Sequence, residues 1–174
     1  METIAVYWEN KIKTYGFQIE LELSLFQISI APHKLASLGS TFFNDINNIN
    51  FSWVLVQQSP NHVFRVYILL AKKWKQPMQA LLERYQENGT RLDLRTESPV
   101  EMVFFHGPHF GDRYGIADTA IRTLRENDLP IIAAGCTGAS VYIILPKDCA
   151  AKASDILSGS FDTPQNSKRI TVPD

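Results

Sequence analysis

The chain has 174 residues, of which 45% are hydrophobic and 20% charged, and its 17 Lys and Arg nearly balance its 18 Asp and Glu. A chain of this size can bury a sizeable core as one domain or two small ones. The balanced charge excludes a disordered acidic chain and the basic footprint of a nucleic-acid binder. The apolar runs at 66–71 and 141–146 are far shorter than the roughly twenty residues of a membrane span. We therefore expect no membrane segment and no leader, and two cysteines favour reduced thiols in a cytoplasmic protein.

The first half of the chain begins with a predicted extra hairpin, residues 4–8 and 11–17 with a turn at Glu9-Asn10. A strand follows at 21–30, where the alternation slips between Leu25 and Phe26 and suggests a bulge or a break. Helical spacing then covers 35–49, and two β-rich segments follow at 51–57 and 63–70 with a turn between them. A second helix over 74–85 and a short strand at 91–95 complete this half.

The second half repeats that order of elements. Its members are a strand at 100–106, a helix over 116–124, strands at 130–136 and 140–145, a helix over 149–157 and a short strand at 169–172. Each half therefore reads βαββαβ, which predicts an α+β fold of two ferredoxin-like units in tandem, with antiparallel sheets and helices on one face. The expected division is an N-terminal hairpin at 1–16, a first unit at 17–97 and a second unit at 98–174.

Two sequence matches support a repeat. Shifted by 76 residues, 31–39 falls on 107–115, and both read Pro-His, then five residues, then Gly. Shifted by 75 residues, 66–70 falls on 141–145, which are Val-Tyr-Ile-Leu-Leu and Val-Tyr-Ile-Ile-Leu. Matches in the same order and nearly the same register predict two copies of one unit. The repeat also places His33 and His109 at equal positions of the two copies.

Residues 103–133 resemble the start of an ACT domain: a strand, a turn with Asp112 that ends in Gly115-Ile116, a helix, and a strand that opens with the apolar pair Ile131-Ile132. The resemblance is closest to the regulatory tail of aspartate kinases, where two such units follow the catalytic domain. It covers about residues 100–161 well. Over 17–97 the likeness is one of architecture alone, because the turn there lacks the acidic residue.

The resemblance implies a pocket for an amino-acid effector, formed by this turn and by the second strand of a paired unit, either 131–135 or 51–56. Gly115 would open the helix so that unpaired N–H groups and the helix dipole attract a carboxylate, while Asp112 would accept hydrogen bonds from an ammonium. The alternative role of Asp112 is that of an N-cap or a solvated turn residue. The predicted effector-binding residues are His109, Asp112, Arg113, Tyr114, Gly115, Ile116, Ile132 and Ala133.

The sequence carries no phosphate-binding glycine motif and no room for a catalytic domain beside the two units, so we expect no enzyme and no cofactor. His106, His109 and Asp112 make a loose metal set, and we expect no metal. Sheets that need cover predict a homo-oligomer such as a dimer, and the resemblance adds an amino-acid biosynthetic enzyme as a partner, with no nucleic acid and no membrane. Two alternatives stay open: a ligand-free interaction or assembly domain, and a small enzyme that uses His106, His109 or His33.

Overall fold

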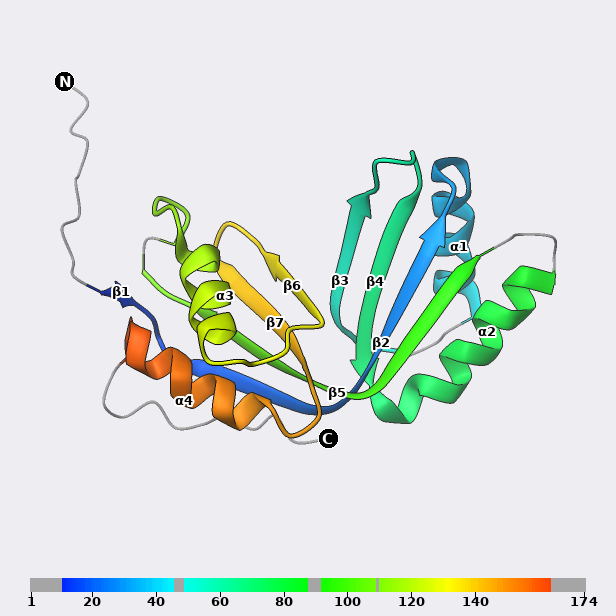
Figure 1. Cartoon of the computed structure of the whole chain (residues 1–174). Helices are drawn as coiled ribbons and strands as arrows, with labels where there is room; N and C mark the ends of the chain where they lie inside the picture. The colour runs from blue at the N-terminus through cyan, green and yellow to red at the C-terminus, as the bar shows by residue number, and fades with distance from the viewer. Residues whose placement is uncertain (1–10, 46–48, 88–91, 109, 164–174) are drawn as a thin grey trace, which may run out of the picture. The chain divides into compact units, whose positions relative to one another are not determined.

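The computed structural model describes residues 11–45, 49–87, 92–108 and 110–163, and these residues form eight strands and four α-helices (Figure 1). Six of the strands are hydrogen-bonded in the order β3-β4-β2-β5-β7-β6, in a mostly antiparallel sheet. The chain divides into two compact units. We call residues 22–100 the inserted unit, and we call the residues up to 21 together with those from 101 the split unit. None of the described helices is long and apolar enough to cross a membrane.

The inserted unit takes its first strand from the second part of β2 (Phe17–Ile30) and its last from the first part of β5 (Asp93–His106). Between them lie α1 (Leu35–Asp45), β3 (Phe51–Gln58), β4 (Phe64–Ala71) and α2 (Lys75–Glu87). Strand β4 pairs in antiparallel fashion with both β2 and β3. Alternate residues of a strand face the same side, and the side facing the helices forms the core, with Phe26, Ile28, Ile30, Val66, Ile68, Leu70, Leu38, Met78, Leu81 and Leu82.

The split unit uses the first part of β2 and the second part of β5, followed by α3 (Ile116–Glu126), β6 (Ala133–Cys136), β7 (Ser140–Pro146) and α4 (Ala150–Ser160). A separate pair of short strands, β1 (Ile12–Lys13) and β8 (Phe161–Asp162), runs parallel. The centre of its core is aromatic: the ring of Phe105 lies 5.0 Å from that of Phe17 and 5.1 Å from that of Phe161. This core therefore needs residues from both ends of the described chain.

A buried carboxylate also stabilises the split unit. Glu101 is 7% exposed and accepts hydrogen bonds from the backbone N–H groups of Asp148 (2.9 Å), Cys149 (3.1 Å) and Ala150 (2.8 Å). These donors stand at the N-terminus of α4, where N–H groups have no partner within the helix. A side chain of β5 thus caps a helix that begins more than forty residues later.

The N-terminal segment differs from the predicted extra hairpin. Its first arm, 4–8, lies outside the described residues, and the described strand β1 pairs with β8. Phe17 and Ile19, both 7% exposed, belong to the core of the split unit, because their side chains point to the same side of β2 and pack in the cluster that contains its aromatic rings. The units consequently divide at 21/22 and 100/101, whereas the sequence placed the divisions at 16/17 and 97/98.

The two long strands also differ from the sequence expectation. Residues 91–95 and 100–106 were expected as separate strands, but from Asp93 onward they form the single strand β5, which continues through the cis peptide bond between Ser98 and Pro99. The expected break near Leu25 and Phe26 is absent, because β2 keeps a continuous register with β4 from Leu23 to Ile30. The irregular residue is Glu22, whose φ is 52°. The short strand expected at 169–172 lies outside the described residues.

Candidate effector-binding site

The predicted effector turn is the connection from β5 to α3, residues 107–115. Its anchor is Phe110, which is 8% exposed and whose ring lies 5.9 Å from that of Phe105. A side chain on Gly107 would collide with the carbonyl of Lys13, and a Cβ on Gly111 would stand 3.3 Å from the carbonyl oxygen of Gly138. The connection therefore lies close against the split unit and passes the tip of the β6–β7 hairpin.

Gly115 ends this connection as the N-cap of α3. It adopts the left-handed conformation, with φ 82° and ψ 2°, which a glycine reaches without steric cost. Its carbonyl accepts the first helical hydrogen bond from the N–H of Thr119 at 2.8 Å, and no side chain caps the helix. The N–H groups of 116–118 thus have no partner within the helix, and with the helix dipole they favour an anion.

The other turn residues differ in their exposure. Asp112 is exposed, and its side chain makes no hydrogen bond or ion pair with the described part of the chain, so it is a solvated turn residue and does not cap α3. Tyr114 is 99% exposed, and Arg113 is half-buried. Ile116 is 5% exposed in the core, so only its backbone can face a ligand. His109 lies outside the described residues.

Ile132 and Ala133 do not join this group within one chain. Both are half-buried at the start of β6, where Ala133 pairs with Ile144 and the N–H of Ile132 donates to the carbonyl of Ile144 at 2.9 Å. The hairpin tip near Gly111 is at the other end of β6, after Cys136. Of the predicted effector-binding residues, the structure therefore keeps residues 112–116 together at the start of α3 and places residues 132–133 away from them.

The Pro-His match between 31–39 and 107–115 is wrong as a structural equivalence. Pro32 and His33 lie in a 3-10 turn that leads directly into α1, and Gly39 lies inside that helix. Gly115 instead precedes its helix. The physical reason is that the split unit has a longer connection between strand and helix, which moves its helix start along the sequence. The second match holds, because residues 66–70 and 141–145 both lie in strands one place in from a sheet edge.

A shallow hollow of about 250 Å³ adjoins the turn in the split unit, and only Pro108 of the turn lines it. Its other lining residues are Lys13, Thr14, Tyr15, Asp162 and Thr163. Among the described residues, no cluster of three His, Cys, Asp or Glu side chains could hold a metal ion.

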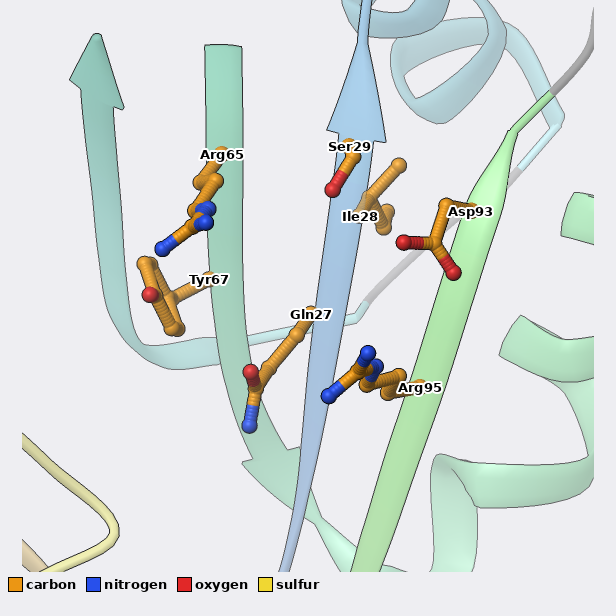
Figure 2. A pocket seen from close by; sticks show the side chains of 7 residues that line it. All are labelled: Gln27, Ile28, Ser29, Arg65, Tyr67, Asp93 and Arg95. Carbon is orange, nitrogen blue, oxygen red and sulfur yellow. The ribbon is translucent and has the colours of Figure 1, made fainter. Parts of the chain in front are cut away.

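A second hollow, of about 140 Å³, lies on the sheet of the inserted unit and was not predicted from the sequence (Figure 2). It is lined by Gln27, Ile28, Ser29, Arg65, Tyr67, Asp93 and Arg95. The available signal was the alternation of polar with apolar residues in the three strands. Each of these strands carries polar or charged side chains at every second position here, on the side away from the core.

No protein-family model matches the chain, and no curated protein matches it by sequence. Solved structures do match. The regulatory subunit of aspartate kinase from Thermus flavus is 14% identical with a TM-score of 0.73, and the match covers 86% of this chain and 99% of that one. The ligand-free regulatory subunit from Thermus thermophilus is 13% identical with a TM-score of 0.71 over the same shares. The chain thus has the fold of aspartate kinase regulatory subunits.

Whole aspartate kinases match over a smaller share of their length. The enzyme from Synechocystis is 14% identical with a TM-score of 0.74, and the match covers 97% of this chain and 30% of that one. E. coli aspartokinase III in complex with lysine and aspartate is 14% identical with a TM-score of 0.58, and the match covers 90% of this chain and 35% of that one. These structural neighbours bear out the ACT-like resemblance that residues 103–133 indicated.

Proposed function

We propose that this chain is a regulatory module that binds a small amino acid and supplies no catalytic groups of its own. The observation that supports this most is the fold, which matches aspartate kinase regulatory subunits over almost their whole length. A structural neighbour, E. coli aspartokinase III, is known in complex with lysine and aspartate. A regulatory domain without its own chemistry would act through a partner, and an amino-acid biosynthetic enzyme in the cytoplasm is the partner that we propose.

We further propose that the chain consists of two ferredoxin-like ACT units. In the inserted unit the sheet order β3-β4-β2-β5 places the first strand between the third and the fourth, which is the ferredoxin-like order. In the split unit the order β6-β7-β5-β2 has the same form. There the N-terminal strand β2 occupies the place of the fourth strand, so the unit is closed by the beginning of the chain.

The proposed effector site is the start of α3. The free N–H groups of 116–118 would bind the carboxylate of the amino acid, and the exposed Asp112 would accept hydrogen bonds from its ammonium. Arg113 adds a positive charge beside the carboxylate. Tyr114 would line the open side, and His109, which lies outside the described residues, is a further proposed contact. Ile132 and Ala133 would come from a paired unit, since within one chain they lie at the far end of β6.

We also propose that two copies of the chain associate through the edge strand β3. Strand β3 is an edge of the sheet and exposes Val54 (48%) and Val56 (45%), with Phe51 (39%) on the same strand and Phe43 (85%) on α1. Unpaired strand edges with apolar side chains favour pairing with another chain. Replacing Val54 and Val56 by lysine should convert a dimer to a monomer in sedimentation, while the exposed pair Glu83 and Arg84 on α2 provides neutral control positions.

Binding would control a partner through differential affinity. If the partner binds the liganded module better than the free one, the two binding events are coupled, and such coupling is typically about 1–3 kcal/mol. The measurement that reads this coupling is the affinity for the partner with and without the amino acid.

A thermal-shift panel of the twenty amino acids, at about 10 mM each, tests the proposal. An amino acid at about a hundred times its Kd should stabilise the chain by ~2.7 kcal/mol, which for this size is a shift of roughly 5–10 °C. Asp112→Ala should abolish the shift and change the free energy of unfolding by no more than about 0.5 kcal/mol, because the residue is exposed. Glu126→Ala, at the other end of α3, removes the same charge and should keep the shift.

The alternative function is a ligand-free interaction or assembly domain. The exposed apolar edge of β3 favours it, because that edge needs a protein partner and no ligand. A panel without any shift, together with a dimer that depends on Val54 and Val56, would support this alternative over effector binding.

A further inference from the structure

The hollow of about 140 Å³ on the inserted unit is built by three neighbouring strands (Figure 2). Each strand contributes two residues at alternate positions, which point to the same side of the sheet: Gln27 and Ser29 from β2, Arg65 and Tyr67 from β4, and Asp93 and Arg95 from β5. A volume of this size holds several waters or one small organic molecule.

The shape of the hollow follows from the pairing of the strands. On β2, Ser29 lies opposite Arg65 and Gln27 opposite Tyr67, and β5 is the neighbour of β2 on its other side. Strands on either side of a central strand are about 10 Å apart, so the side chains from β4 and β5 flank β2, with Arg95 beside Gln27 and Asp93 level with Ser29 (Figure 2). The side chain of Ile28 is 1% exposed in the core on the helix side, so only its backbone faces the hollow.

The charges in the hollow favour an anion. Arg65 and Arg95 are exposed, and within the described part of the chain neither guanidinium makes an ion pair or a hydrogen bond with a side chain. Two cations on one small face repel each other and add no stability to the fold. Asp93 supplies one carboxylate in the lining, and the next carboxylate along this face of β5, Glu97, accepts a hydrogen bond from the Gln27 amide at 3.4 Å.

We propose that this hollow binds an acidic α-amino acid, with one carboxylate on the guanidinium of Arg65, the other on that of Arg95, and the ammonium at Asp93. Guanidinium groups bind carboxylates through two parallel hydrogen bonds. The hydroxyl groups of Ser29 and Tyr67 can donate further hydrogen bonds to the carboxylate oxygens. This site lies in the inserted unit, goes beyond the proposed effector turn and does not depend on it.

Calorimetric titration of the full chain with L-glutamate and L-aspartate tests the proposal. Saturable binding of at least one of them is expected, and the affinity should fall with added salt because the arginines are exposed. Arg65→Gln and Arg95→Gln should each weaken the binding about tenfold or more. Asp93→Asn should weaken the binding of glutamate but not that of glutarate, which has no ammonium.

Two control variants make the outcome specific to the hollow. Arg84→Gln removes the same charge from the exposed surface of α2 and should bind like the wild type. The double variant Arg65→Gln/Arg95→Gln leaves the proposed effector turn intact, so glutamate binding that survives in it belongs to the turn, whereas binding that is lost belongs to the hollow. Both lining arginines are exposed, so neither substitution should unfold the chain. If one of the two variants nevertheless misfolded, the other would still test the proposal.

Three results would overturn the proposal. One is the absence of saturable binding for glutamate and aspartate. Another is wild-type binding in both arginine variants. The third is an affinity for L-glutamine or for inorganic phosphate equal to that for glutamate. Equal affinity for glutamine would show that the second carboxylate contributes nothing, and equal affinity for phosphate would show the same for the ammonium.

Discussion

The two units enter their first helices in different ways. In the inserted unit, Pro32 stands at the start of the 3-10 turn before α1, and the N–H groups that follow are used at once: Lys34 donates to the carbonyl of Ala31 at 2.9 Å, and Leu35 donates to that of Pro32. In the split unit, residues 107–115 intervene before α3, and no side chain caps the helix. The N–H groups before α1 are therefore hydrogen-bonded within the short connection, whereas the first N–H groups of α3, after the long connection, have no partner within the helix.

On the sheets it is the inserted unit that has the polar hollow, whereas the split unit has an aromatic pair. On the side away from the helices, the split unit stacks the rings of Phe104 and Tyr142 at 5.8 Å with an interplanar angle of 14°. The repeat equates Tyr142 with Tyr67, and beside Tyr67 the inserted unit has the charged hollow with Arg65. Each unit thus exposes polar groups at a place where its counterpart does not, so the two proposed ligand sites are not copies of one another.

The largest expected effect tests whether the split unit depends on the beginning of the chain. Phe17→Ala removes a ring that contacts Phe105 and Phe161, and the loss of such a buried ring costs about 3–5 kcal/mol. Hydrogen exchange should show weaker protection of α3 and α4 while α1 and α2 keep theirs. Leu21→Ala on the same strand is the control, because Leu21 is 49% exposed and should cost less than about 0.5 kcal/mol. Equal loss in all four helices would contradict two separate cores.

An intermediate effect concerns the start of each second helix. In the split unit Glu101 caps α4, whereas in the inserted unit no side chain caps the 3-10 turn that begins α2. Glu101→Ala leaves three N–H groups at the start of α4, one buried and two partly buried, without this partner and should lower the free energy of unfolding by about 1–3 kcal/mol. Denaturant titration measures this, and Glu97→Ala, an exposed carboxylate on the same strand, should cost less than about 0.5 kcal/mol. Equal costs for both would show that the cap adds nothing.

The sequence predicted those elements whose periodicity is local. All four helices and the hairpins β3–β4 and β6–β7 lie where apolar spacing placed them. The swap of the N-terminal strand into the split unit was not predictable in this way, since Phe17 and Ile19 read as an ordinary apolar alternation whatever sheet they join. The cap by Glu101 was missed for the same reason, because its partners lie far along the chain.

The candidate turn was predicted in part. Gly115 was identified as the residue that opens α3, and its φ of 82° agrees with that interpretation. Its supposed counterpart Gly39 was misplaced, because a Pro-His pair and a glycine at matched spacing do not reveal how many residues each unit spends before its helix. The hollow with Arg65 and Arg95 was missed because it needs three strands that are apart in sequence.

The smallest expected effect has opposite signs at these two glycines. Gly115→Ala forces a side chain into a left-handed conformation and should destabilise the chain by about 1 kcal/mol. Gly39→Ala should stabilise it by about 0.5–1 kcal/mol, because the residue is inside α1 and an added Cβ meets nothing within 4 Å. Thermal unfolding of both variants measures the difference. Effects of the same sign would mean that the two glycines have the same backbone role. They would thus contradict the difference between the two helix starts on which the proposed effector site depends.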